Sequence, residues 1–266
     1  MRLSWDLPGY FGLIGIGVLA TAAAHAQRLA DATVAITGNV AELHVSSTPR
    51  PLRDGLLELS RTFHWRIGFE EACLRYSGDL VDMTSPKYVP KSPDDRAYDP
   101  RGGPLEIQFA VSPETGQPPD RDAVVRALLA EYLARGYPGH YTFQSEHGQN
   151  GYVYVYPDEV ANVGGSLEKA APVTMVHLKI AVRDKETTRE VFLDAVSQMT
   201  RVSGKKVAEP GVGNQPWSAR PADIDKPAYA FLNDAASAFG VRFWQVLWDP
   251  SPSFRDYAIS FCCGQD

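Results

Sequence analysis

An amphipathic helix followed at once by an apolar strand occurs twice in this chain, and this order limits the folds that it can adopt. In residues 51–63 (PLRDGLLELSRTF) leucines recur at helical spacing, and residues 65–69 (WRIGF) then alternate as a half-buried strand does. The same order returns at 226–239 and 241–248. Because each such helix and strand has an apolar face to bury, the sequence predicts helices packed on a β-sheet.

The remaining periodic segments complete an α+β plan. We expect further strands at 105–111, 141–145, 152–156, 173–182, 206–208 and 257–261, and further helices at 120–135 and 187–202. Each half then reads β-α-β followed by β-α-β-β, which predicts two similar small domains, each an open sheet with two helices packed on one face. The expected parts are a first domain at 34–157 with a proline-rich loop at 86–104, a linker at 158–172 and a second domain at 173–263.

The two helix–strand units match each other without a gap. Sliding the sequence by 176 residues, the spacing from Pro51 to Pro227, also aligns Leu56 with Leu232, Phe63 with Phe239 and Arg66 with Arg242. These matches cover the helix start, its apolar face and the following strand. We therefore expect the two halves to be copies of one ancestral unit.

The first of these units resembles the short N-terminal domain of secretins and TonB-dependent receptors. The resemblance rests on Pro51, Leu52, Asp54, Leu56, Leu59, Ser60 and Arg61, on Trp65, Arg66, Ile67 and Phe69, and on the hairpin 141–156 with Pro157 after it. It covers residues 40–157 and, more loosely, 173–261. It implies a periplasmic interaction module without catalysis. Because this chain contains no pore or barrel region, the family's transport roles are not carried over.

The N-terminus has the pattern of a cleavable signal peptide. Arg2 precedes the uncharged apolar run 11–23, and Ala24-His25-Ala26 places small residues where the peptidase reads them. The run is shorter than the roughly 20 residues needed to cross a bilayer, although an uncleaved anchor is the alternative. We expect residues 1–26 to be removed and the protein to be exported, to the periplasm or the extracellular space, with no membrane span afterwards.

The net charge of −6 argues against a nucleic-acid partner. Loss of Arg2 and Asp6 with the signal peptide leaves this charge unchanged, and the sequence contains no cluster of basic residues. Nucleic-acid backbones are bound mainly through Lys and Arg. We therefore expect no nucleic-acid partner; the predicted export and the resemblance imply that the partner is another envelope protein.

Three cysteines, Cys73, Cys262 and Cys263, leave the disulfide pattern open. In an oxidising compartment Cys73 can pair with either of the terminal two, which is the pairing that we favour. A strained bond between the adjacent Cys262 and Cys263 and three reduced thiols are the alternatives. The chain has no CxxC pair, which argues against a cysteine-ligated metal.

Signatures of catalysis and of metal binding are absent. The histidines after the signal peptide form no HxH or HxxxH pattern; they are His44, His64, His140, His147 and His177. No GxSxG elbow occurs. We interpret Glu70-Glu71 as surface charges, and Asp94, Asp95 and Asp99 as part of a solvated loop, because they lack the ordered spacing of a calcium loop. We expect no catalytic residue, no cofactor and no metal.

Aromatic side chains gather in the second half of the chain. Alternation along 241–248 sends Phe243 to one face of its strand, and Trp244 and Trp248 to the other. If helices cover only one face of the sheet, one of these sets is exposed. We predict a partner surface of Phe243, Trp244, Trp248 and Tyr257 on a non-catalytic protein-interaction module. The alternatives are a hydrolase with a site between the halves and a small-ligand carrier.

Overall fold

The computed structural model describes residues 32–112, 117–146, 151–210 and 223–264. The predicted signal peptide, residues 1–26, lies outside these ranges, so its cleavage stays a prediction. Helices and sheets are mixed throughout the described chain, and the α+β class is confirmed.

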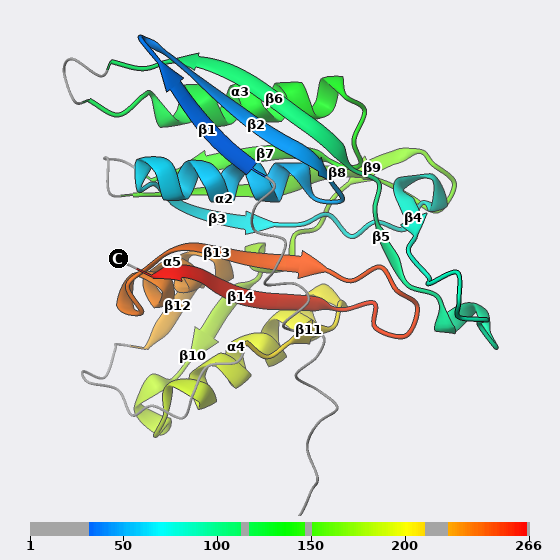
Figure 1. Cartoon of the computed structure of the whole chain (residues 1–266). Coiled ribbons are helices and arrows are strands. Elements are labelled where there is room, and N and C mark those ends of the chain that lie inside the picture. Colours follow the sequence, from blue (N-terminus) through cyan, green and yellow to red (C-terminus); the bar gives the residue numbers. More distant parts are fainter. Residues whose placement is uncertain (1–31, 113–116, 147–150, 211–222, 265–266) are drawn as a thin grey trace, which may run out of the picture.

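One mixed sheet runs through the centre of the protein and takes strands from both halves of the chain (Figure 1). Its strand order is β11-β14-β13-β3-β8-β7, with β9 paired to β8. The strands are β3 (Arg66–Glu70), β7 (His140–Ser145), β8 (Tyr152–Ala161), β9 (Leu167–Lys169), β11 (Val207–Ala208), β13 (Val241–Trp248) and β14 (Tyr257–Gly264). In its middle, β3 and β13 pair in parallel, with Phe243 opposite Ile67.

The two halves therefore share one sheet instead of forming the separate sheets that we expected. The physical reason lies in β3 and β13, which are buried on both faces along most of their length. Such strands are typical of a sheet interior covered on both sides. Pairing them also removes two apolar edges from solvent.

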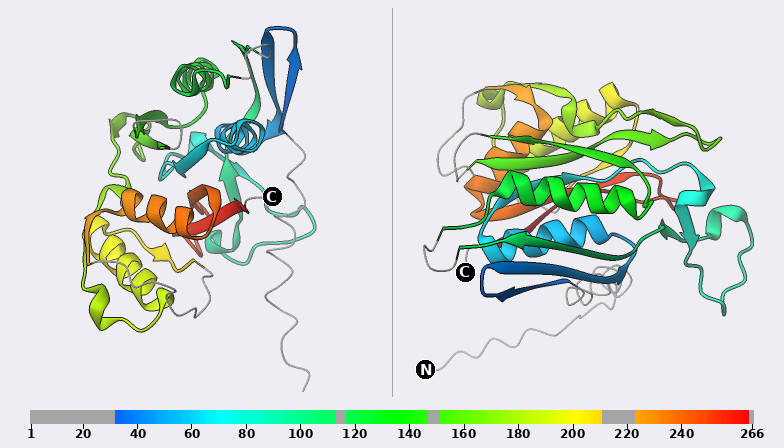
Figure 2. Two further views of the ribbon diagram at one scale, coloured as in Figure 1. Left: turned by 90° about the vertical axis from the view of Figure 1, so that its left-hand side faces the viewer. Right: turned by 90° about the horizontal axis from the view of Figure 1, so that it is seen from above.

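On one face of the central sheet lie α2 (Pro51–Phe63) and α3 (Arg121–Ala134), and beyond them a second sheet (Figures 1 and 2). This outer antiparallel sheet has the order β1-β2-β6. Its strands are β1 (Ala32–Thr37), β2 (Val40–Thr48) and β6 (Gly103–Ala110). Leu56 of α2 belongs to a core that joins both sheets, with Leu43 on one side and Ile67 on the other.

The opposite face of the central sheet is covered by α4 (Thr188–Ser203) and α5 (Ala228–Ala238), as Figure 1 shows. A short antiparallel pair, β10 (His177–Ile180) and β12 (Ile224–Pro227), completes this layer. Phe192, Leu232 and Trp244 are central to its core. The two helices of each half thus lie on one face, as expected, but because the halves share one sheet, helices cover both of its faces.

The helices form where local sequence signals place them. Pro51 occupies the first turn of α2, where its missing N–H has no partner to lose, and His64 ends the helix in the left-handed conformation. α4 begins with a capping box of Thr187 and Glu190 and ends at Gly204, whose φ is 67°. These boundaries lie within about two residues of the predicted ones, which is the usual uncertainty of a helix end.

The segment that we predicted as a linker, 158–172, is largely a hairpin. β8 continues to Ala161, and β9 returns along it, with Glu159 opposite Lys169. After it, the predicted strand 173–182 is a short 3-10 helix (Val173–Met175) followed by β10. β9 is exposed throughout and is held by main-chain pairing, so its side chains carry little of the apolar signal of a strand.

The two matching helix–strand units lie side by side through β3 and β13. Arg66 of β3 contacts Ser237 at the end of α5, and Arg242 of β13 contacts His64 at the end of α2. Each arginine therefore reaches the end of the other unit's helix. The duplication itself stays a prediction.

Candidate functional site

The predicted aromatic surface is buried, so its assignment as a partner surface is wrong. Phe243 and Trp244 have no exposed surface, and Trp248 and Tyr257 are almost fully buried. Alternation along β13 does place Phe243 in the core with α2, and Trp244 and Trp248 in the core with α5. Because a layer covers each face, neither set reaches solvent.

Trp244 is held by packing and by a hydrogen bond. Its Nε1 donates to Oδ1 of Asn233 at 2.8 Å, and its ring stacks on Tyr154 with ring centroids 5.5 Å apart. Gly68 on the neighbouring β3 leaves room for the indole, since a Cβ at that position would lie 2.2 Å from the ring. Trp244 is thus a structural residue of the shared sheet.

The favoured disulfide is not formed. Cys73 is a free, buried cysteine. Cys73 packs in the core with α4 and α5, whereas Cys262 packs against the core with α2 and α3. The central sheet separates the two residues. The side chain of Cys263 lies outside the described part of the structure.

Four of the histidines lie on separate elements, and each contacts a charged side chain. The pairs are His44 with Glu106, His64 with Arg242, His140 with Glu159 and His177 with Asp225. His147 lies outside the described residues. Within the described ranges, no three His, Cys, Asp or Glu side chains gather in a way that could hold a metal ion.

Glu70 and Glu71 are both buried, which overturns their interpretation as surface charges. Glu70 ends β3, and its carboxylate meets the start of the 3-10 helix at 173–175. The backbone N–H groups of Val173 and Thr174 donate to its two oxygens at 2.7 and 3.0 Å. The hydroxyl of Tyr154 donates to the same carboxylate at 3.1 Å. Glu70 therefore ties β3 to the second half of the chain.

The protonation of Glu70 should make stability depend on pH. Burial raises the pKa of Glu70 above its ordinary value, and the hydrogen bonds from Thr174 and Val173 offset this only in part. The folded state then binds the proton more tightly than the unfolded state. The stability that this gives is fully present below the unfolded pKa of about 4.3 and is lost as the pH rises towards the folded pKa.

Glu70→Gln removes this titration while keeping the shape of the side chain. We expect E70Q to gain stability relative to the wild type as the pH is raised from about 4 to about 7. Urea unfolding of both proteins at each pH measures the difference. A difference that moves in favour of the wild type with rising pH would show that the hydrogen bonds outweigh burial.

Glu71 belongs to a buried ionic cluster centred on Arg50. Nε of Arg50 donates to the two oxygens of Glu71 at 2.8 and 3.2 Å, and Nη1 donates to Asp99 at 2.8 Å. Nη2 donates to the backbone oxygen of Trp248 at 3.2 Å. Burial opposes the charge of Arg50, but the carboxylates of Glu71 and Asp99 more than offset it and raise the pKa of Arg50. One guanidinium thus joins four distant segments of the chain.

Residues 80–100, called the arm below, project from this cluster to one side of the molecule (Figures 1 and 2). At its base β4 (Leu80–Asp82) pairs with β5 (Tyr98–Pro100). An ion pair of 2.8 Å between Asp82 and Arg96 links its two sides. Asp99 in β5 is bound by Arg50, so the base of the arm is attached to the core.

The outer part of the arm is also ordered by hydrogen bonds. Ser92 and Asp95 form a capping box around a 3-10 turn at 93–95. Ser253, in the loop after β13, donates to the backbone oxygen of Asp94, and Tyr98 N donates to Ser251 Oγ at 3.2 Å. These contacts hold the arm in one conformation. Asp95 caps the turn but is exposed, as expected of a solvated loop, whereas Asp99 is partly buried against Arg50.

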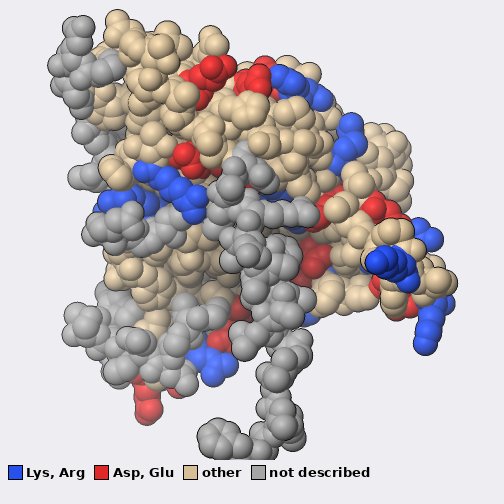
Figure 3. Space-filling model, in the orientation of Figure 1, with Lys and Arg blue, Asp and Glu red and all other residues tan. Residues whose placement is uncertain are grey.

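The arm exposes a concentration of large apolar side chains. Val89 is 82% exposed and Tyr88 50%, and Val81 and Met83 are each more than two fifths exposed. No other described segment of this length exposes as many. Figure 3 shows basic and acidic side chains interspersed with uncharged surface on the arm. Solvent-exposed apolar groups gathered in this way are a mark of contact surfaces.

The sequence pattern placed a loop here but did not show that it is ordered. The local signal that could have done so is Ser92-Pro93-Asp94-Asp95, whose first and last residues have the spacing of a capping box. The attachment through Arg50 is invisible to any local pattern, because 49 residues separate Arg50 from Asp99. Exposure of the apolar side chains likewise depends on where the arm points.

Comparison with known proteins adds no family or relative. The chain matches no protein-family model, and neither the curated proteins nor the solved structures contain a significant match. Within the described residues, no helix combines the length and the apolar character that crossing a bilayer requires.

Proposed function

We propose that this chain is an exported, non-catalytic protein-interaction protein and that the arm is its contact element. The observation that carries the proposal is the concentration of Val81, Met83, Tyr88 and Val89 on a projecting segment that is hydrogen-bonded to itself and to the core. A partner that covers these side chains removes apolar surface from water, which favours association.

An ordered arm binds at a smaller entropic cost than a flexible loop. Immobilising a side chain at an interface costs about 0.5–1.5 kcal/mol, and ordering a loop adds to this. In the arm, the paired strands and the capping box already hold the backbone. Tyr88 is a suitable anchor, because tyrosine is enriched among the residues that dominate binding energies.

The charges next to Tyr88 and Val89 indicate the chemistry of the partner. Lys87 and Lys91 flank Tyr88 and Val89 in the sequence. A matching surface would offer an apolar depression with acidic groups at its rim, where charges guide association and register. The resemblance of the first helix–strand unit to a periplasmic interaction domain supports the same class of function.

Photo-crosslinking from the arm tests the proposal. A benzophenone amino acid is placed at Val89 of the full chain in its source cells, with Val202 of α4 as the matched position, since that valine is 63% exposed. We expect a discrete adduct with one envelope protein from position 89 and none from position 202. Adducts of equal yield from both positions, or none from position 89, would contradict the arm as contact element.

Substitution then measures the contribution of the arm to binding. With the captured partner purified, Tyr88→Ala should raise the Kd by about tenfold or more, since hot-spot anchors are worth about 2 kcal/mol or more and 1.4 kcal/mol is tenfold. Stability should change by no more than about 0.5 kcal/mol, because the side chain is half exposed. Val202→Ala is the matched control and should leave the Kd unchanged. An unaltered Kd for Tyr88→Ala would remove Tyr88 from the interface.

A further inference from the structure

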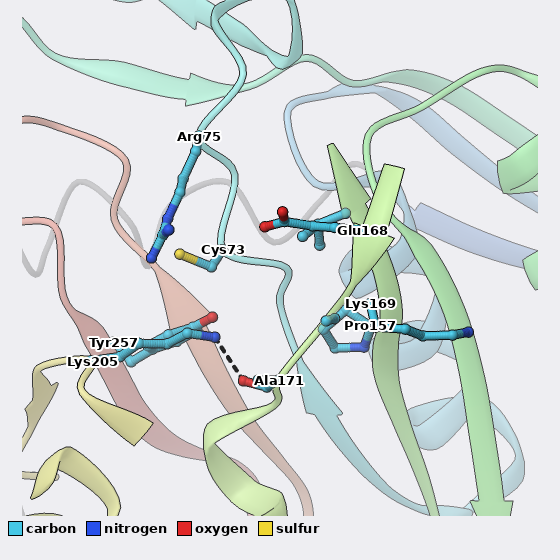
Figure 4. Close-up of a pocket in the computed structure, with 10 residues that line it drawn as sticks. Cys73, Arg75, Pro157, Glu168, Lys169, Ala171, Lys205 and Tyr257 are labelled. Atoms are coloured by element: carbon cyan, nitrogen blue, oxygen red, sulfur yellow. Dashed lines mark hydrogen bonds between the residues drawn. The ribbon is translucent and has the colours of Figure 1, made fainter. Parts of the chain in front are cut away.

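A pocket of about 180 Å³ opens on the second-half side of the central sheet, away from the arm's apolar side chains. It lies where the chain after β3, the β8–β9 hairpin and the turn before β11 meet the start of β14 (Figure 4). Cys73, Tyr257 and Val160 form its buried wall, and Arg75, Lys205 and Glu168 bring charges to it. A pocket of this size has room for a small ligand.

Tyr257 offers the pocket a hydrogen-bonding group. The residue is 1% exposed and lines the pocket. Burial raises the pKa of Tyr257 well above its ordinary value, so the hydroxyl keeps its proton at neutral pH and is a donor. A ligand oxygen in the pocket could accept a hydrogen bond from this hydroxyl.

Two cations line the pocket with Tyr257. The Nζ of Lys205 is 5.8 Å from the centroid of the Tyr257 ring and donates to the backbone oxygen of Ala171 at 2.6 Å. An ammonium group has three donors, so others remain. Arg75 extends from the opposite wall towards Tyr257 in Figure 4, and its guanidinium has no ion-pair partner within the described chain. Lys169 also lines the pocket, but its ammonium is engaged by Glu159 at 3.2 Å.

Glu168 limits how much negative charge a ligand can bring. Its carboxylate faces the same space from β9 (Figure 4). Two cations and one carboxylate then favour a single negative charge at the Arg75 and Lys205 side. A second negative group directed towards Glu168 would be repelled.

We propose that this pocket binds a small organic monocarboxylate, held by Arg75, Lys205 and the hydroxyl of Tyr257. The guanidinium and the ammonium each donate to the carboxylate, the hydroxyl completes its hydrogen bonds, and Cys73 and Val160 contact the apolar remainder. The proposal is independent of the arm, and the protein partner and the carboxylate could be bound separately.

Ligand-observed NMR on the purified full chain tests this, with propionate as the probe and its neutral isostere propionamide as the matched ligand. At constant ionic strength we expect saturable binding of propionate and at least about fivefold weaker binding of propionamide, which lacks the charge. Succinate, with a second carboxylate, should also bind more weakly than propionate. Equal binding of propionate and propionamide, or no saturable binding of propionate, would overturn the proposal.

Variants localise the binding. Arg75→Gln, Lys205→Gln and Tyr257→Phe should each raise the Kd for propionate at least about fivefold. Tyr257→Phe keeps the buried ring, so it remains informative if Lys205→Gln does not fold. Lys179→Gln, at an exposed lysine of β10, is the matched control and should bind as the wild type does. If Tyr257→Phe and Arg75→Gln bind as tightly as Lys179→Gln, the carboxylate does not occupy this pocket.

Discussion

Replacing Arg50 with alanine should lower the free energy of unfolding by about 3–5 kcal/mol, because it leaves the buried carboxylate of Glu71 without its counter-charge. Arg50 donates to both oxygens of Glu71, and the side chain of Glu71 has 5% of its surface exposed. The loss also removes the hydrogen bond to the backbone of Trp248. Guanidinium chloride unfolding, followed by tryptophan fluorescence, measures the change.

Asp99→Asn is the matched control, because it removes the other ionic partner of Arg50 and leaves Glu71 paired. Asp99 is more exposed than Glu71, and such pairs contribute about 0–1 kcal/mol. Both variants should nevertheless release the base of the arm, which limited proteolysis within 80–100 would detect. If R50A and D99N lose the same stability, the pair with Glu71 is not the main contribution of Arg50.

Trp244→Ala should have an effect of similar size, about 3–5 kcal/mol, because it removes a fully buried indole and leaves a cavity. It also leaves Oδ1 of Asn233 without its donor in a buried site. Phe239→Ala, at a phenylalanine that is 44% exposed, is the control and should lose much less. Denaturant unfolding compares the two.

A double-mutant cycle of Gly68→Ala with Trp244→Ala tests whether β3 and β13 pack against each other as described. Alone, Gly68→Ala should destabilise by about 1–3 kcal/mol, since its Cβ would lie 2.2 Å from the Trp244 ring. In the Trp244→Ala background the obstacle is gone, so the same change should be close to neutral or stabilising by about 0.5–1 kcal/mol. Additive effects in this double-mutant cycle would show that Trp244 does not pack on Gly68.

Both experiments examine whether the two halves form one unit. Arg50 reaches the backbone of Trp248, and Gly68 accommodates Trp244, so each contact joins the first half to the second. Glu70 adds a third connection, through Val173 and Thr174. We infer that the halves unfold together, since neither keeps a complete core when the shared sheet is opened.

The features that could be predicted from the sequence alone are local ones: helix bounds, strand bounds and the alternation of side chains along a strand. Helix 51–63 and strand 241–248 have the predicted bounds. The apolar residues of an amphipathic helix and of a strand recur with different periods, and each period can be read from consecutive residues. The alternation along β13 also separated Phe243 from Trp244 correctly. These features depend on a few consecutive residues, and the sequence contains all of them.

Which helix and strand faces pack against each other depends on the tertiary structure. The pairing of Phe243 with Ile67 joins residues 176 positions apart, and no local period records such a choice. Burial of Trp244, Glu70 and Glu71 follows from that pairing and from the layers on both sides of the sheet. The order of the arm and the position of Tyr257 in the pocket depend on the same kind of distant contacts. A periodic pattern shows that a side chain has a face to bury, whereas the partner that buries it is set by the whole chain.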